Sequence, residues 1–106
     1  GAQAMRTLLE REPRIDGIFA ACDSIAMGAI EELRKSGRLV PRHVRVVGFD
    51  DSPWAPAHRP ALTTISQPSE MLGERMSELV LRQLRGEDLR GVVEVVPIKL
   101  VRRESA

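Results

Sequence analysis

Two aspartates, Asp50 and Asp51, stand directly after an apolar run that covers residues 44–49. Carboxylates accept hydrogen bonds and can orient a polar ligand. In open α/β sheets ligands bind beyond the carboxyl ends of the strands, so this position predicts a ligand role for at least one of the two. The alternative interpretation is that both aspartates shape the turn into the proline-rich loop that follows.

Other polar side chains stand near the ends of the neighbouring predicted strands. Cys22 ends one of them, Asp23 comes next, and Gln67 follows another. If these strands are parallel neighbours, Cys22 and Asp23 lie close to Asp50, and Gln67 reaches the same edge. A carboxylate, an amide and a small thiol would suit a neutral polyol or heterocycle, which directional hydrogen bonds orient. The sequence therefore predicts a ligand-binding edge with Asp50, Gln67 and Cys22.

Hydrolytic chemistry finds no support in the spacing of the nucleophiles and bases. There is no G-x-S-x-G motif, and neither His43 nor His58 has a matched spacing to Cys22 or to a serine. Motifs that cradle nucleotide phosphates are also missing. We therefore expect a protein that is not an enzyme, has no catalytic residues and needs no cofactor.

A magnesium-dependent phosphoacceptor domain is a competing hypothesis from another class. Asp23, Asp50 and Asp51 would hold the metal, as three carboxylates at strand ends can. Partners on later strands would be needed, and Lys99 is poorly placed because it lies in the middle of a predicted strand. We expect no metal site.

The elements that would position these side chains follow from apolar periodicity and from the proline and glycine breakers. In chain order the pattern predicts helix 2–12, strand 15–22, helix 25–36, strand 44–49, strand 63–66, helix 70–85 and strand 92–101. This alternation is typical of an α/β fold: a partial, doubly wound, mostly parallel sheet with helices on both faces. A helix that opens the chain has no strand to cross over from, which predicts a piece of a larger unit.

Several details of these elements can be tested against a structure. Asp23 or Ser24 would cap the second helix, and Ser69 would cap the third. Pro97 inside the last strand predicts an edge position or a bulge. The third helix should bury a stripe made of Leu72, Met76, Leu79, Val80 and Gln83.

Length and composition limit the classes of function. With 106 residues, of which 42% are hydrophobic, the chain suits one small domain with a core. Sixteen basic and fifteen acidic residues give a net charge of +1, so nothing argues for nucleic acid or an anionic membrane as the partner of this segment. No apolar run is long enough to span a membrane. The single cysteine excludes an internal disulfide and is compatible with a reducing compartment.

Three separated segments carry a family resemblance, in the right order and with the right gaps. They are AACDSIAMGAIEELRKSGRLVPRHVRVVGFDDSPWA, PALTTISQPSEMLGERMSELVLRQL and PIKLVRRES. Together they resemble the C-terminal part of LacI/GalR-type transcriptional regulators over nearly the whole chain. The resemblance implies a lobe of a periplasmic-binding-protein-like effector domain, with residues 1–106 forming part of the C-terminal lobe. The N-terminal lobe and the helix-turn-helix headpiece would be absent.

The resemblance also implies roles for individual residues. Asp50 is the aspartate of the family's G-[YF]-D-[DN] motif, which hydrogen-bonds the effector, and Gln67 is the glutamine of T-T-I-x-Q. Cys22 stands where an asparagine often binds sugar hydroxyls, and this departure removes an amide donor and acceptor. Asp23 would cap the helix rather than bind ligand.

Family members dimerise through this lobe, which implies a dimer interface that includes Met27, Trp54 and His58. From the residues alone, Met27 falls outside the predicted buried stripe, and Trp54 covers either a pocket or a partner. The implied function is the effector-sensing part of a cytoplasmic regulator that binds a sugar or nucleobase-like molecule. Operator DNA would be bound through the missing headpiece, with no membrane partner. A periplasmic sugar-binding protein is the remaining alternative, and residues upstream of Gly1 would distinguish the two.

Overall fold

The computed structural model describes all residues from 1 to 106, and they form two compact units. The first unit, which we call the sheet unit, contains Gly1–Ser66 and Lys99–Ala106. The second, the helical unit, contains Gln67–Ile98. Each is described by itself.

The sheet unit is built on four strands in the order β1-β2-β3-β4. They are β1 (Gly17–Phe19), β2 (Arg45–Asp50), β3 (Thr63–Ser66) and β4 (Lys99–Val101). The first three strands are parallel, and β4 pairs antiparallel with β3 at one edge. The predicted mostly parallel α/β sheet is therefore confirmed, and so is the edge position of the last strand.

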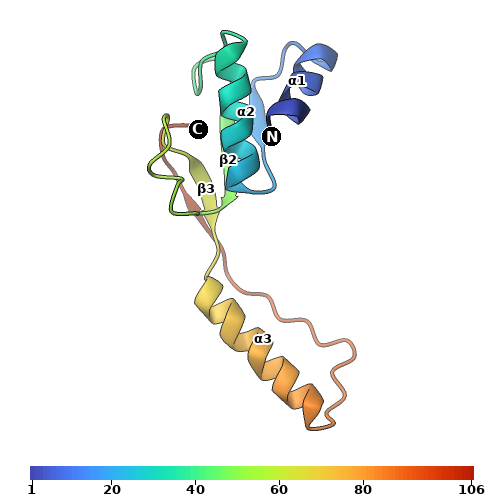
Figure 1. Cartoon of the computed structure of the whole chain (residues 1–106). Helices are drawn as coiled ribbons and strands as arrows, with labels where there is room; N and C mark the ends of the chain where they lie inside the picture. The colour runs from blue at the N-terminus through green and yellow to red at the C-terminus, as the bar shows by residue number, and fades with distance from the viewer. The chain divides into compact units, whose positions relative to one another are not determined.

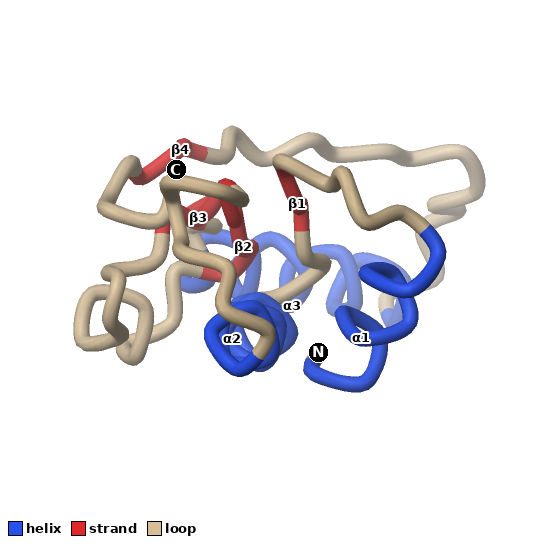
Figure 2. The backbone as a smooth tube through the Cα atoms, turned by 90° about the horizontal axis from the view of Figure 1, so that it is seen from above, coloured by secondary structure: helices blue, strands red, loops and turns tan.

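Two helices of the sheet unit, α1 (Ala2–Arg11) and α2 (Asp23–Lys35), lie together on one side of the sheet (Figures 1 and 2). This arrangement decides which face of β2 is buried: Val46 and Gly48 are buried, whereas Val47 and Phe49 are half-buried. The run at 44–49 reads as a strand covered on both faces, but its burial alternates within this unit because both helices pack on the same side.

The core joins both helices to the sheet. Its buried apolar residues are Met5, Ala20, Ala26, Ala29, Ile30, Leu33, Val44, Val46, Ala55 and Leu62. An ion pair adds to the packing between the helices: Arg6 Nε lies 2.9 Å from Glu32 Oε1. Glu32 is buried, so its carboxylate needs this partner. The sheet unit thus has a closed core of its own.

The helical unit consists of α3 (Ser69–Leu84), the turn at Gly86 and an irregular segment up to Ile98. Gly86 has a φ of +88°, the left-handed conformation that glycine adopts readily after a helix. Local ion pairs join Arg82 to Glu87 and Asp88 to Arg90.

Two predictions about this region are wrong. The stripe predicted to be buried on α3 is not, because the helix has no buried residue and Met76 and Val80 are exposed. The strand predicted over 92–101 covers Lys99–Val101 alone, so Pro97 lies outside it. An amphipathic pattern shows which face of a helix is apolar, but not whether another element covers it. Within the helical unit no element covers the apolar face of α3.

Candidate ligand-binding rim

The carboxyl ends of β1 and β2 bring Cys22 and Asp50 together, as the sequence predicts. Beyond β1, the amide of Ala20 still bonds the carbonyl of Val47 on β2 at 2.8 Å, and the chain then reaches Cys22. Asp50 is the last residue of β2 and is exposed. Phe19 of β1 stands opposite Val47 of β2, and Cys22 and Asp50 each lie three residues further along, so both come to the same edge of the sheet. We call this end of the sheet unit the rim.

Hydrogen bonds at the start of α2 lower the pKa of the Cys22 thiol. Its Sγ lies 3.1 Å from Ser24 Oγ, and the amide of Ile25 also faces it. These two contacts hold the pKa of the Cys22 thiol below its ordinary value, with the Ser24 hydroxyl as the larger cause, although the charge of Asp50 acts in the opposite direction. The rim therefore contains a partly exposed, polarised thiol next to a carboxylate.

The backbone at the end of β2 takes an uncommon course. Asp50 has a φ of +114° and Asp51 a φ of +56°. Residues other than glycine rarely adopt positive φ, and aspartate is among those that tolerate it best. Such backbone persists where surrounding contacts determine it, and it clusters at ligand sites. The contacts that hold it here come from three separate parts of the chain.

The first contact comes from Asp23, the first residue of α2. Its carboxylate is buried: Oδ2 accepts from the Ser52 amide at 2.7 Å and Oδ1 accepts from Thr64 Oγ1 at 2.5 Å. Gly48 permits this approach, because a Cβ there would collide with Asp23 Oδ1. The prediction that Asp23 or Ser24 caps α2 is wrong, because both residues lie inside the helix. Cys22 takes the N-cap position without a side-chain cap bond, because the Asp23 carboxylate is committed to residues far along the chain.

The prediction for Ser69 fails in the same way. Ser69 is the first residue of α3, Pro68 takes the N-cap position, and no side chain makes the cap bond. Serine is a frequent cap, but the cap must stand one residue before the helix begins.

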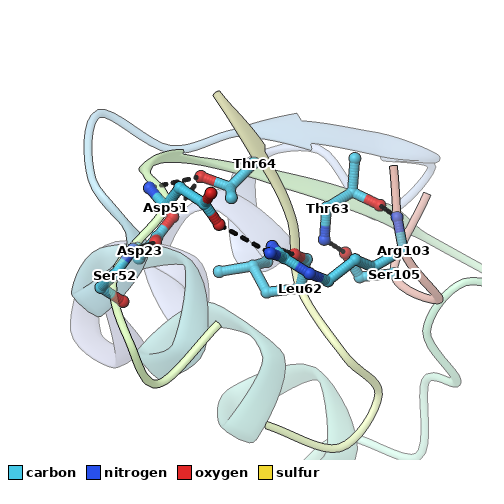
Figure 3. A network of polar contacts seen from close by, with 8 residues as sticks. All are labelled: Asp23, Asp51, Ser52, Leu62, Thr63, Thr64, Arg103 and Ser105. Carbon is cyan, nitrogen blue, oxygen red and sulfur yellow. Dashed lines mark hydrogen bonds and ion pairs between the residues drawn. The ribbon is translucent and has the colours of Figure 1, made fainter. Parts of the chain in front are cut away.

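The second and third contacts hold Asp51 (Figure 3). Its amide donates to Thr64 Oγ1 at 3.4 Å, and its Oδ1 lies 2.7 Å from Arg103 Nη2. Arg103 also donates from Nη1 to the Leu62 carbonyl at 2.8 Å. Asp51 is therefore a structural partner of the C-terminal segment, while Asp50, its neighbour, stands exposed at the rim.

Sequence reasoning missed the part played by the C-terminal segment. Ser105 is buried, accepts from the Thr63 amide at 2.8 Å and donates to the Val46 carbonyl at 2.6 Å. Together with Arg103 it ties the end of the chain to β2 and β3, and Figure 3 shows the contacts of both residues with Thr63 of β3. No local pattern could reveal this, since the partners of Ser105 lie 42 and 59 residues away in sequence.

The structure gives no support to the magnesium hypothesis. No three or more histidine, cysteine, aspartate or glutamate side chains gather so that they could hold a metal ion. Of the three aspartates invoked, Asp23 is used by Ser52 and Thr64, and Asp51 is paired with Arg103.

Gln67 directly follows Ser66, the residue of β3 that stands opposite Asp50 in the register. It is also the first residue of the helical unit. Its place at the rim therefore stays a prediction.

The residues predicted for a dimer interface differ in exposure. Trp54 is 72% exposed. His58 is half-buried, and the Nδ1 atom of His58 lies 3.1 Å from the Pro60 carbonyl oxygen. Met27 is only partly exposed and packs against the core, so its position outside the predicted stripe does not leave it bare. The interface itself stays a prediction.

Comparison with known proteins now defines the class. The family model of the periplasmic binding protein-like domain matches residues 1–106. The HTH-type transcriptional regulator CelR of Thermobifida fusca is 43% identical over 105 residues, which cover 99% of this chain and 31% of that protein. A lactose operon repressor of Rhizobium radiobacter is 35% identical over 106 residues, covering 100% of this chain and 93% of that sequence.

Solved structures agree with these relatives. A CelR–cellobiose complex matches with a TM-score of 0.90 and 42% identity, over 99% of this chain and 32% of that one. The Lac repressor dimer bound to operator and the anti-inducer ONPF matches with a TM-score of 0.84 and 28% identity, over 98% and 36%. The chain belongs to the periplasmic binding protein-like domain family, in the form found in LacI-type transcriptional regulators.

Both of these relatives are named as regulators of transcription, and neither is named as an enzyme. The chain spans less than a third of the length of the CelR relative. None of its helices is both long and apolar enough to cross a membrane.

Proposed function

We propose that this chain is the effector-sensing and dimerisation part of a LacI-type transcriptional regulator. The effector is a small polar molecule, a sugar or a nucleobase-like compound, and it contacts Asp50, Gln67 and Cys22. The observation that carries the proposal is the exposed Asp50 at the carboxyl ends of parallel strands, in a chain 42% identical to a regulator solved with cellobiose. Ligands of open α/β sheets bind at this edge.

The mechanism we propose is a shift between conformational states. Effector bound between this lobe and an N-terminal lobe favours one closure state, and a dimer transmits that state to helix-turn-helix headpieces on operator DNA. In this proposal residues 1–106 are part of the C-terminal lobe of a longer cytoplasmic protein. Two facts support this proposal: the chain matches 31% of the length of the CelR relative, and that relative is named as an HTH-type regulator.

Cys22 bears on the identity of the effector. An asparagine at this position would offer an amide donor and acceptor, whereas a thiol is a weak donor and a weak acceptor. We therefore expect an effector that needs less hydrogen bonding beside Asp50 than a simple sugar does. Two probes distinguish a sugar effector from a nucleobase-like effector: a cellobiose analogue and a purine base.

The test uses the full-length regulator that contains this chain. Cellobiose, lactose, ribose, sucrose and purine bases are screened by thermal shift, and hits are titrated by calorimetry. A true effector raises the melting temperature as its concentration rises, because it binds the folded state. Failure of every sugar and base to do so would contradict the proposed function.

Two matched variants then locate the site. Asp50→Asn removes the charge at the rim while keeping a residue that tolerates positive φ, and it should weaken effector binding about tenfold, as loss of a charge-assisted hydrogen bond does. Asp16→Asn is the control, because Asp16 is exposed and precedes β1 at the amino ends of the parallel strands. Equal affinities of both variants and the wild type would remove Asp50 from the site.

The dimer prediction has its own test. Sedimentation of the full-length protein should show a dimer, and Trp54→Ala together with His58→Ala should shift the equilibrium towards monomer. Trp54 is chosen because a tryptophan exposed to this extent at the surface is typical of an interface anchor. A double variant that dimerises as tightly as the wild type would exclude this surface.

A further inference from the structure

The contacts of the turn that carries Asp50 are made mainly by side chains distant in sequence. Ser52 bonds Asp23, 29 residues away, and Asp51 pairs with Arg103, 52 residues away. Thr64 links the two sets, because its Oγ1 donates to Asp23 and accepts from the Asp51 amide. Residues 51 and 52 are thus held by an α2 residue, a β3 residue and the C-terminal segment.

This arrangement bears directly on Asp50, which precedes the held residues. With Asp51 and Ser52 tied at their amides, Asp50 keeps its φ of +114°, a conformation costly for any residue other than glycine. If a tie were lost, the turn could relax to an ordinary negative φ. A change of φ at Asp50 would rotate its carboxylate away from the direction that the turn now imposes.

Asp23 has the features of a residue that supports others rather than one that binds. Asp23 as a whole is 1% exposed, so its carboxylate cannot itself reach a ligand in solvent. Both of its oxygens are engaged, one by a backbone amide of the turn and one by the hydroxyl of β3. Gly48 leaves room for it on β2.

From this geometry we infer that Asp23 is a positioning residue: through Ser52 and Thr64 it fixes the turn that aims the Asp50 carboxylate at an effector. Arg103 supports the same turn from the C-terminal segment through Asp51. The inference rests on the proposed function for what Asp50 binds, and on the hydrogen-bond network alone for how Asp50 is held. Sensing would then depend on two residues that do not touch the effector.

The decisive variant is Asp23→Asn, which has nearly the same shape. An asparagine amide offers one acceptor oxygen where the carboxylate offers two. If that oxygen keeps the bond from the Ser52 amide, the asparagine NH2 faces Thr64 Oγ1, so the contact with Thr64 reverses its direction and loses the charged acceptor. The matched control is Glu32→Gln, which removes another buried carboxylate from the same helix, one that pairs with Arg6 instead of the turn. Both variants are made in the full-length regulator.

Two readouts are taken on each variant. Titration calorimetry with cellobiose, or with whichever other sugar or purine base of the screen binds the wild type, should show Asp23→Asn binding about tenfold more weakly, with Glu32→Gln binding like the wild type. Amide hydrogen exchange should show faster exchange at Asp51 and Ser52 in Asp23→Asn and unchanged exchange there in Glu32→Gln. A melting temperature lowered in both variants would not by itself account for that difference.

The outcomes separate this inference from the proposed function. If Asp23→Asn binds effector as tightly as the wild type, or if Asp51 and Ser52 exchange at the wild-type rate, the positioning role is wrong. If no effector binds the wild type, the proposed function fails, and the exchange rates alone decide whether Asp23 holds the turn. Arg103→Lys adds a check, because lysine cannot bond Asp51 and the Leu62 carbonyl with a planar fork, so it should loosen Asp51 more than Ser52.

Discussion

The sheet unit and the helical unit both contain amphipathic helices, but they differ in what those helices bury. In the sheet unit, α2 alone contributes the buried apolar residues Ala26, Ala29, Ile30 and Leu33. In the helical unit, α3 is longer and buries none. An apolar helical face stabilises a fold only where another element covers it. The same helical spacing of apolar residues therefore belongs to a buried face in α2 and to an exposed face in α3.

The sheet unit contains long-range ion pairs beside the local pairs Arg14–Glu12 and Arg34–Glu31, whereas the pair at the end of α3 in the helical unit is local. The pairs Arg6–Glu32 and Arg103–Asp51 in the sheet unit join residues 26 and 52 positions apart. The pair Arg82–Glu87 in the helical unit spans five positions. A long-range pair exists only in the folded chain, whereas a local pair can also form in the unfolded chain and then adds little to stability. Three paired experiments test this difference.

The largest effect is expected from core truncation. Leu33→Ala in α2 removes a side chain that is fully buried, so the free energy of unfolding should fall by about 2–5 kcal/mol. Leu84→Ala in α3 removes a side chain that is 78% exposed, and surface changes of this kind usually stay within about 0.5 kcal/mol. Urea unfolding of the chain measures both. Equal losses would show that α3 is buried in solution.

A smaller effect is expected from the ion pairs. Arg103→Ala leaves the half-buried Asp51 carboxylate and the Leu62 carbonyl without their donor and should cost about 1.5–3 kcal/mol of unfolding free energy. Arg82→Ala breaks an exposed pair, and because exposed pairs contribute little to stability, its loss should be clearly smaller. Urea unfolding at low and high salt distinguishes them, because salt screens exposed pairs more strongly. If the loss of unfolding free energy in Arg103→Ala also depended on salt, the Arg103–Asp51 pair would be as exposed as the Arg82–Glu87 pair, and the contrast between the two units would be wrong.

The smallest effect concerns acid stability. The hydrogen bond from Arg6 lowers the pKa of Glu32, and that from Arg90 lowers the pKa of Asp88. A carboxyl whose folded pKa lies below its unfolded value adds stability above the unfolded pKa, and this is lost as the pH falls through the folded pKa. Glu32→Gln should therefore flatten the loss of stability below the ordinary glutamate pKa.

Asp88→Asn is the counterpart in the helical unit. Asp88 and Arg90 are two residues apart, so their contact can also form in the unfolded chain, and we expect it to lower the pKa of Asp88 there as well. Thermal melts from neutral to acid pH should then give parallel curves for Asp88→Asn and the wild type. Parallel curves for Glu32→Gln would show that its long-range pair is not maintained in solution.

Local sequence signals were sufficient for most of the scaffold. Periodicity and breakers predicted a helix near Ala2–Arg11 that ends before Pro13, the strand Thr63–Ser66 and the helix Ser69–Leu84 within a residue or two. The placement of Asp50 at a strand end also followed from local pattern. These features depend on neighbours within a few residues, where propensity and side-chain spacing act.

Long-range contacts decided what the sequence could not. The cap predicted for Asp23 was wrong because its carboxylate is drawn to Ser52 and Thr64, 29 and 41 residues away. The buried stripe on α3 was wrong because periodicity says which face is apolar but not whether anything covers it.

The sequence by itself determined the order of the helices and strands, the bounds of the three helices to within a residue or two, and which polar side chain stands at the end of β2. Only the tertiary structure decided how that side chain is held, since Asp23, Thr64 and Arg103 reach the turn from three distant parts of the chain. The physical reason is range: propensity acts over one or two turns, whereas buried polar groups take whichever partner the fold brings within hydrogen-bond distance.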